Sequence, residues 1–181
     1  METIGFLELN SIAQGIEVSD IMLKTSEVKL LDAKPCCPGK YVILICGDVA
    51  AVKSSVEAGK QVGGSFVIES TVIPRVHPQV ISAISMSTDI INTDALGILE
   101  FFSITSAIMA ADAAAKAADV QLIEVRLGIG IGGKSFITMT GDVAAVSESV
   151  KCGANIGGEN GLLLNQIVIP NPRKEIFTNM F

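Results

Sequence analysis

Residues 4–12 read IGFLELNSI and residues 96–104 read LGILEFFSI, so one pattern of apolar residues, glutamate and serine occurs twice in 181 residues. Two shorter motifs recur in the same order: GDVAAV at 47–52 and 141–146, and VIP at 72–74 and 168–170. The offset between the copies grows from 92 to 94 and then 96 residues along the chain. Because loops accept insertions that packed elements do not, this drift predicts a duplicated unit with two short loop insertions.

Each copy predicts the same elements in the order β-α-β-β-α-β. The expected strands cover residues 4–9, 28–34, 41–46 and a run ending at Pro74, and then 97–101, 120–127, 134–140 and a run ending at Pro170. Serine and aspartate are preferred N-caps because their side-chain oxygens accept a first-turn N–H. Helices are therefore expected after four such residues: Ser11, Asp48, Ser103 and Asp142.

The helix ends and the domain limits follow from the same pattern. Gln14 completes a capping-box spacing with Ser11, and glycine pairs within 61–64 and 155–158 are expected to end the second helix of each copy. A short helix is expected after each proline of the VIP motif. The order is that of a ferredoxin-like unit. The predicted fold class is α/β (α+β ferredoxin-like), with domains at 1–86 and 95–181 and a linker at about 86–94.

Composition limits the partners. The chain is 49% hydrophobic, yet it contains no uncharged apolar run of the roughly 18 residues that would span a bilayer, so no membrane partner is expected. A net charge of -6 without Lys/Arg runs argues against nucleic acid. The N-terminus has no export signal, which favours a cytoplasmic protein with reduced cysteines. The apolar excess predicts burial between subunits, and hence an oligomer.

These motifs resemble the bacterial microcompartment shell domain. The resemblance rests on IGFLE, on a helix with Asp and Lys four residues apart, on GDVAAV, and on VIP followed by a basic residue, in both copies and in unpermuted order. It implies the tandem-domain (BMC-T) subclass: a non-enzymatic shell subunit that forms a homotrimer and tiles as a pseudohexamer with a central pore. The implied partners are other microcompartment shell proteins and encapsulated redox enzymes.

The resemblance also implies which residues lie on the edge of the tile. These are the helix lysines and the basic residues after the fourth strand: Lys24, Lys116, Arg75 and Arg173. The alternative is that they are ordinary solvated charges. The second copy departs from the pattern because Asn171 stands where the first copy has Arg75.

The loop between the second and third strands of the first copy reads KPCCPGK at 34–40. Cys37, Pro38 and Gly39 followed by lysine resemble the propanediol-utilisation T-type shell proteins, which implies that Cys37 lines the pore. There it would help to hold a 4Fe–4S cluster shared by three subunits, in which cysteine thiolates are the usual ligands. Two alternatives stay open: Cys37 is a small residue in a turn, or Cys36 competes for the iron.

The corresponding loop of the second copy is rich in glycine and carries no sulfur. Its expected pore residues are Gly130, Ile131, Gly132 and Gly133. The segment from Gly128 to Ser135 satisfies the Walker A pattern, but a phosphate-binding loop must open a helix, and the following SFITMTGD is typical of a strand. Nucleotide binding is therefore not expected.

Other classes of function have weaker support. His77 is the only histidine in the sequence, and no Ser, Asp or Cys stands at the spacing of a catalytic motif relative to it. Glu8 and Glu100 look like a carboxylate pair, but duplication explains their symmetry. The main alternative to a shell subunit is a tandem ferredoxin-like sensor that binds a small molecule.

Overall fold

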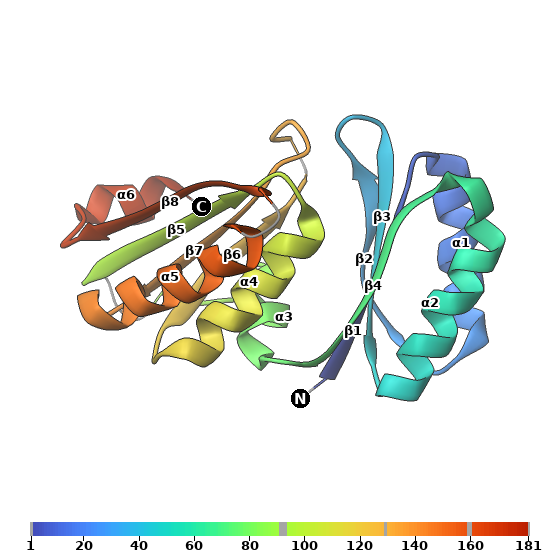
Figure 1. Cartoon of the computed structure of the whole chain (residues 1–181), viewed down its shortest axis with the longest axis horizontal. Coiled ribbons are helices and arrows are strands. Elements are labelled where there is room, and N and C mark those ends of the chain that lie inside the picture. The colour runs from blue at the N-terminus through green and yellow to red at the C-terminus, as the bar shows by residue number, and fades with distance from the viewer. Residues whose placement is uncertain (1, 91–93, 129, 159–160, 181) are drawn as a thin grey trace. The chain divides into compact units, whose positions relative to one another are not determined.

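The computed structural model describes residues 2–90, 94–128, 130–158 and 161–180 (Figure 1). The chain divides into two compact units: residues 1–78 with 129–133 form the first, and residues 79–128 with 134–181 form the second. Residues 91–93 of the expected linker lie outside the described residues. No helix in the described ranges is long and apolar enough to cross a membrane.

The first unit has the expected order of elements. They are β1 (Glu2–Leu9), α1 (Ile12–Thr25), β2 (Lys29–Cys36), β3 (Lys40–Gly47), α2 (Val49–Gly63), a 3-10 turn η1 (Gly64–Phe66) and β4 (Val67–Val76). The strands pair antiparallel in the order β2-β3-β1-β4. Both long helices cover one face of this sheet (Figure 1).

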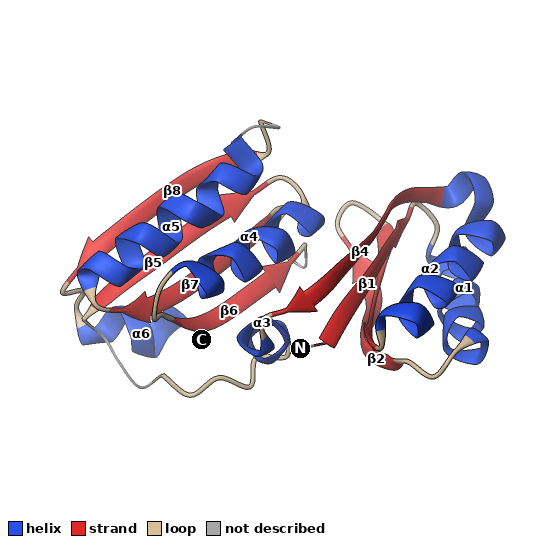
Figure 2. Ribbon diagram, turned by 60° about the horizontal axis from the view of Figure 1, so that its bottom comes forward, coloured by secondary structure: helices blue, strands red, loops and turns tan. Residues whose placement is uncertain are grey.

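The second unit repeats this order after a short helix. Its elements are α3 (Pro78–Ile84), β5 (Ala95–Phe101), α4 (Ile104–Ala117), β6 (Gln121–Leu127), β7 (Ser135–Gly141), α5 (Val143–Gly158), β8 (Leu163–Pro170) and α6 (Lys174–Met180). The sheet order β6-β7-β5-β8 is the same topology (Figure 2). The predicted pair of ferredoxin-like units is confirmed. Residues 79–86, assigned to the first domain from the sequence, pack with the second unit.

The helices begin where the sequence predicts them. Ser11 Oγ accepts from Gln14 N at 3.3 Å, and Ser103 Oγ accepts from Ser106 N at 3.2 Å. Asp48 Oδ1 accepts from Ala50 N at 2.9 Å. The expected capping box is only half formed, because the Gln14 carboxamide donates to Glu17 Oε2 on its own helix.

The glycine of the duplicated IGFLE motif allows a helix to approach the sheet closely. A Cβ atom on Gly97 would lie 2.7 Å from Val146 Cγ1 of α5, and one on Gly5 would lie 2.7 Å from Val56 Cγ2 of α2. Such distances are far below van der Waals contact, so any side chain here would push the helix off the strand. This contact explains why the decisive motif carries glycine at the same place in both copies.

Strand β4 is longer than expected. The sequence predicts its end at Pro74, but it continues to Val76, which pairs with Glu2. The register with β1 shifts between the pair Ile4–Ile73 and the pair Glu2–Val76, so Pro74 lies in an irregularity of an edge strand. Proline is tolerated there because its missing N–H removes no regular ladder bond.

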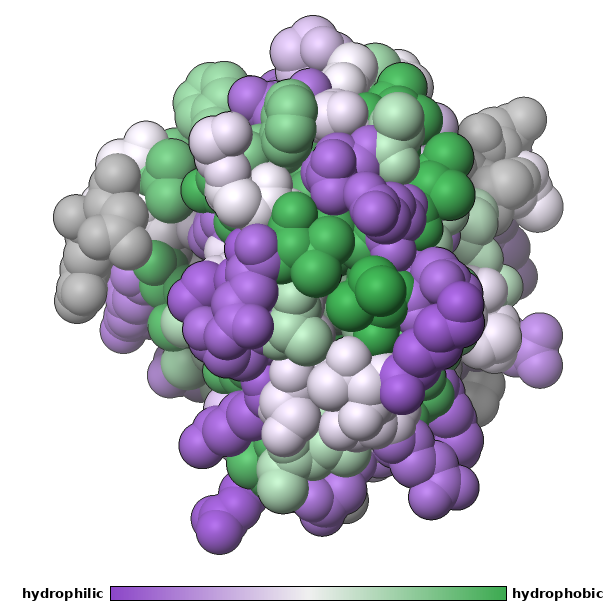
Figure 3. Space-filling model, turned by 90° about the vertical axis from the view of Figure 1, so that its right-hand side faces the viewer, coloured by the Kyte–Doolittle hydropathy of each residue, from purple (hydrophilic) through white to green (hydrophobic). Residues whose placement is uncertain are grey.

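The helical side of the first unit carries apolar surface. Figure 3 shows hydrophobic residues at the centre of this face, bordered by hydrophilic ones. The large apolar side chains exposed on α1 and α2 are Ile12, Ile16, Leu23, Val49 and Val62. Surface of this kind is typical of a protein–protein interface.

Candidate functional site

The turn between β2 and β3 holds the two adjacent cysteines. Gly39 N donates to Cys36 O at 2.9 Å, which closes a turn over Cys36–Gly39, and Gly39 has a φ of 91°. That backbone conformation favours glycine, so Gly39 is what allows the chain to reverse here. The Cys37–Pro38 peptide bond is cis. Cys37 therefore lies inside the turn, whereas Cys36 is the last residue of β2.

The two thiols differ in accessibility. Cys36 is 6% exposed and Cys37 is half-buried. Burial raises the pKa of the Cys36 thiol to about 11; the negative charge of Glu8 adds to this increase, and Lys40 partly opposes it. Because the thiolate is the form that binds metals, Cys36 is poorly suited as a ligand at neutral pH.

The raised pKa of Cys36 predicts a loss of stability in alkali. Its ordinary value is 9.0, so between about pH 9 and pH 11 the unfolded chain releases a proton that the folded chain keeps. The free energy of unfolding should therefore fall as pH rises through this window, by roughly 3 kcal/mol at full effect. Urea unfolding of wild type and Cys36→Ala between pH 8 and pH 11 measures the difference. If the free energy of unfolding changed equally with pH in the two proteins, the raised pKa of Cys36 would be contradicted.

An ion pair supports each turn. Lys40 Nζ lies 3.2 Å from Glu8 Oε1, and Lys134 pairs with Glu100 at the equivalent place in the second unit. Each pair ties the first residues after a turn to the end of the central strand β1 or β5. The two glutamates were noted in the sequence only as a duplicated pair. The signal that was missed is the lysine that follows each turn in both copies.

The turn between β6 and β7 is built from glycine. Gly128 N donates to Lys134 O at 3.0 Å, and Gly130, Gly132 and Gly133 have φ values of 69°, 68° and 78°. Ile131 lies within this turn, and Ile129 lies outside the described residues. Ser135 begins strand β7 rather than a helix, as expected from the sequence, so the Walker A pattern lacks the helix N-terminus that a phosphate needs.

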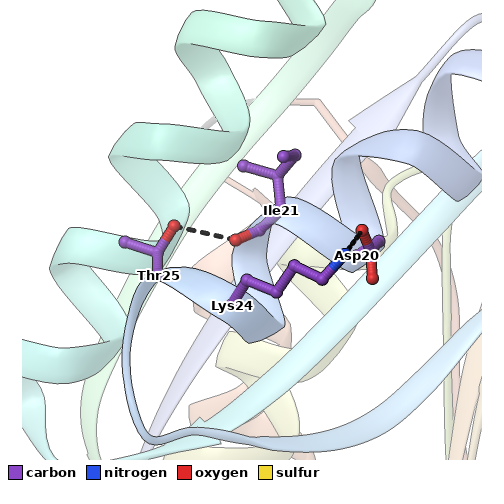
Figure 4. Close-up of polar contacts among 4 residues, drawn as sticks. All are labelled: Asp20, Ile21, Lys24 and Thr25. Carbon is purple, nitrogen blue, oxygen red and sulfur yellow. Dashed lines mark hydrogen bonds and ion pairs between the residues drawn. The ribbon is translucent and has the colours of Figure 1, made fainter.

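The predicted edge residues are on the surface. Lys24 pairs with Asp20 at 2.5 Å on α1 (Figure 4), and Lys116 pairs with Asp112 at 2.6 Å on α4. The side chain of Lys24 is 70% exposed and that of Lys116 is 39% exposed. The Lys24–Asp20 pair is exposed on both sides and so contributes little to stability, whereas Asp112, the partner of Lys116, is only 14% exposed.

Arg75, near the end of β4, and Asn171, directly after β8, share an unusual backbone. Arg75 has a φ of 56° and its equivalent Asn171 has a φ of 47°, and neither is glycine. Left-handed backbone at a non-glycine residue costs free energy and is common at functional positions. Arg173 is exposed two residues after Asn171. Among the described residues, one chain contains no group of three or more His, Cys, Asp or Glu that could hold a metal ion.

The fold and these turns define a class of protein. It has two ferredoxin-like units in tandem, and the turns between the second and third strands occupy equivalent places but differ in sequence. The BMC domain matches residues 3–76 and 95–172, and the chain therefore belongs to the bacterial microcompartment shell protein family. Members of this family form the shell of microcompartments within the cytoplasm. The chain is thus a structural shell subunit located there.

The relatives agree with this assignment. The chain is 40% identical over 179 residues to the bacterial microcompartment shell protein PduT of Citrobacter freundii, covering 99% of this chain and 97% of that protein. One half matches the shell protein EutM of Salmonella typhimurium at 35% identity over 79 residues, covering 42% of this chain and 82% of that protein. The crystal structure of a microcompartments protein from Desulfitobacterium hafniense superimposes with a TM-score of 0.96 at 55% identity, covering 98% of this chain and 99% of that one.

Proposed function

We propose that the chain is a non-enzymatic tile that assembles as a homotrimer, so that three copies supply six domains in a pseudohexamer. The observation that carries this proposal is that both halves match the same domain, in the same element order. Closed rings are the usual result of repeated head-to-tail contacts, and a duplicated chain needs only three copies to supply six such units. The turns Cys36–Gly39 and 128–134 would line the central pore.

We further propose that the tiles pack edge to edge with one another and with other microcompartment shell proteins. Lys24, Lys116, Arg75 and Arg173 would make these contacts. The support is their exposure, together with the left-handed backbone that sets the chain direction at Arg75 and Asn171. Encapsulated redox enzymes are the expected partners on the inner side of the shell.

Removing the edge lysines should reduce sheet formation. In Lys24→Ala/Lys116→Ala protein, trimers should form normally but hexagonal sheets should be scarce by negative-stain electron microscopy, because each chain of the trimer loses two charged side chains at the edge. Lys60→Ala is the matched control, since Lys60 is also an exposed helix lysine paired within its own helix. Sheets as abundant as in wild type would contradict the edge assignment, and a wild type that forms none would contradict the tile itself.

The pore turn fits a shared 4Fe–4S cluster. Cys37 is the more accessible of the two thiols in the turn, while Cys36 is buried with a pKa of about 11. Cluster ligands are cysteine thiolates, so one Cys37 from each of three chains could hold three irons and leave one iron for a non-protein ligand. When bound, such a cluster would supply one-electron transfer across the shell. The similarity to PduT, at 40% identity, covers 99% of this chain.

The residues around Cys37 have definite roles in this proposal. Gly39 and Pro38 hold the turn, and the Glu8–Lys40 pair anchors its end to β1. The glycine-rich turn Gly130–Gly133 carries no acidic or sulfur side chain, so its backbone N–H groups would face polar or anionic metabolites. The two turns therefore give the pore a cluster site and a polar lining.

A further inference from the structure

In the second unit, one side chain attaches α3 to the edge of the sheet. Gln79 Nε2 donates to Val120 O at 3.1 Å, and Gln79 Oε1 accepts from Leu122 N at 2.8 Å. Strand β6 is an edge strand, so this carboxamide takes the place that a neighbouring strand would occupy. Val80 of α3 and Leu122 of β6 are both fully buried.

The duplication supplies a second version of both sides of this contact. With the offsets of 96 and 92 residues, Gln79 and Val80 correspond to Glu175 and Ile176 of α6, and Val120 and Leu122 correspond to Val28 and Leu30.

Local structure supports the alignment. The ladder of each edge strand has a register shift at the same place, after Leu30 and after Leu122. The left-handed residues Arg75 and Asn171 also lie at equal distances before α3 and α6.

In the single chain, the apolar side chains of the second version are exposed. Leu30 is 44% exposed where Leu122 is 0% exposed, and Ile176 is 44% exposed where Val80 is 0% exposed. Val80 and Leu122, which lie next to the bonds of Gln79, are therefore buried, whereas their equivalents Ile176 and Leu30 are exposed. Phe177 keeps α6 attached to its own unit, because it is 7% exposed and packs with Leu96 and Ile123.

We propose that α6 of one copy docks on the start of β2 of a second copy, with Ile176 against Leu30 and Glu175 beside the backbone of Val28–Leu30. This inference rests on the proposed homotrimer and names the surface that closes it. The contact is head-to-tail, because α6 and β2 belong to different units, and such contacts generate a ring when the rotation closes. It reproduces between chains the contact that α3 makes with β6 in the second unit.

The difference between Gln79 and Glu175 makes the two contacts unequal. A carboxamide both donates and accepts, whereas a carboxylate only accepts. Glu175 can therefore accept from Leu30 N but cannot donate to Val28 O. The contact between chains therefore lacks one hydrogen bond that α3 makes with β6. A single substitution that restores this bond should strengthen the association between chains.

The first test is the association of Leu30→Asp and Ile176→Asp, measured by sedimentation velocity over a range of protein concentrations. Each change places an unpaired charge in the contact, so the trimer should dissociate at a concentration roughly tenfold or more above that of wild type. Both side chains are half exposed in the single chain, and circular dichroism checks that each variant is folded. Phe66→Asp is the matched control: Phe66 is also 44% exposed but lies at the opposite end of the sheet, where its carbonyl accepts from Asn10 N.

The outcomes separate this inference from the proposed function. A wild-type trimer that Leu30→Asp and Ile176→Asp leave intact would overturn the docking of α6 on β2 while the tile stands. A wild-type protein that is not a trimer would overturn the tile itself. Glu175→Gln should tighten association by several-fold, because it supplies the missing donor to Val28 O; weaker association of Glu175→Gln than of wild type would contradict the position given to residue 175.

Discussion

Anaerobically reconstituted Cys37→Ser protein should contain almost no iron or sulfide and should lack the visible absorbance of a cluster, whereas Cys36→Ser should retain most of both. The reason is the difference between the two thiols in one turn. Cys37 is half-buried, but Cys36 is 6% exposed and has a pKa of about 11. A buried thiol in this state is a poor ligand at neutral pH.

The control is to show that both serine variants still fold and associate as wild type does. Without a cluster, sedimentation should give the same association state for wild type, Cys37→Ser and Cys36→Ser, since the apoprotein is also expected to be a trimer. If Cys36→Ser loses the cluster and Cys37→Ser keeps it, the ligand assignment is reversed. If wild-type protein reconstituted in the same way holds no iron, the cluster proposal is wrong.

Gly157→Ala should lower the free energy of unfolding by about 1–3 kcal/mol, as overpacked cores do. A Cβ atom at this position would lie 2.5 Å from Phe101 Cε1 and 3.2 Å from the backbone nitrogen of Leu163. Phe101 is fully buried, so its ring cannot move aside without disturbing the core. Urea unfolding at a fixed protein concentration measures the change, because association also affects the apparent stability.

Gly158→Ala is the matched control for that measurement. It is the next residue of α5, and a Cβ atom there would meet nothing within 4 Å. Alanine is favoured over glycine in helices, so this variant should be as stable as wild type or more stable by up to about 1 kcal/mol. Equal destabilisation by the two substitutions would show that the loss of glycine at the C-terminal end of α5, and not the contact with Phe101, determines the effect.

Much of the fold was predictable because the sequence contains it twice. The caps at Ser11, Ser103 and Asp48 were identified from local chemistry, and local hydrogen bonds of this kind depend on neighbouring residues alone. The end of β4 was predicted wrongly, because proline ends a regular strand but is tolerated at a bulge on an edge, and whether a strand is on an edge depends on the whole sheet.

The parts of the site that escaped prediction involve residues far apart in sequence. The bonds from Gln79 to residues 41 and 43 positions away have no local signature, so a sequence pattern cannot reveal them. The choice between Cys36 and Cys37 as the accessible thiol also depends on folding, because the strand buries one side chain and the turn leaves the other partly open. The ion pairs of Lys24 with Asp20 and of Lys116 with Asp112, by contrast, follow from a repeated i,i+4 spacing that the sequence shows directly.

Native mass spectrometry of anaerobically reconstituted wild-type protein gives both the number of chains and the number of clusters in one spectrum. We expect three chains carrying one cluster between them, with the apoprotein also a trimer. A monomer, or an assembly in which every chain carries its own cluster, would contradict the proposal that three copies meet around Cys37.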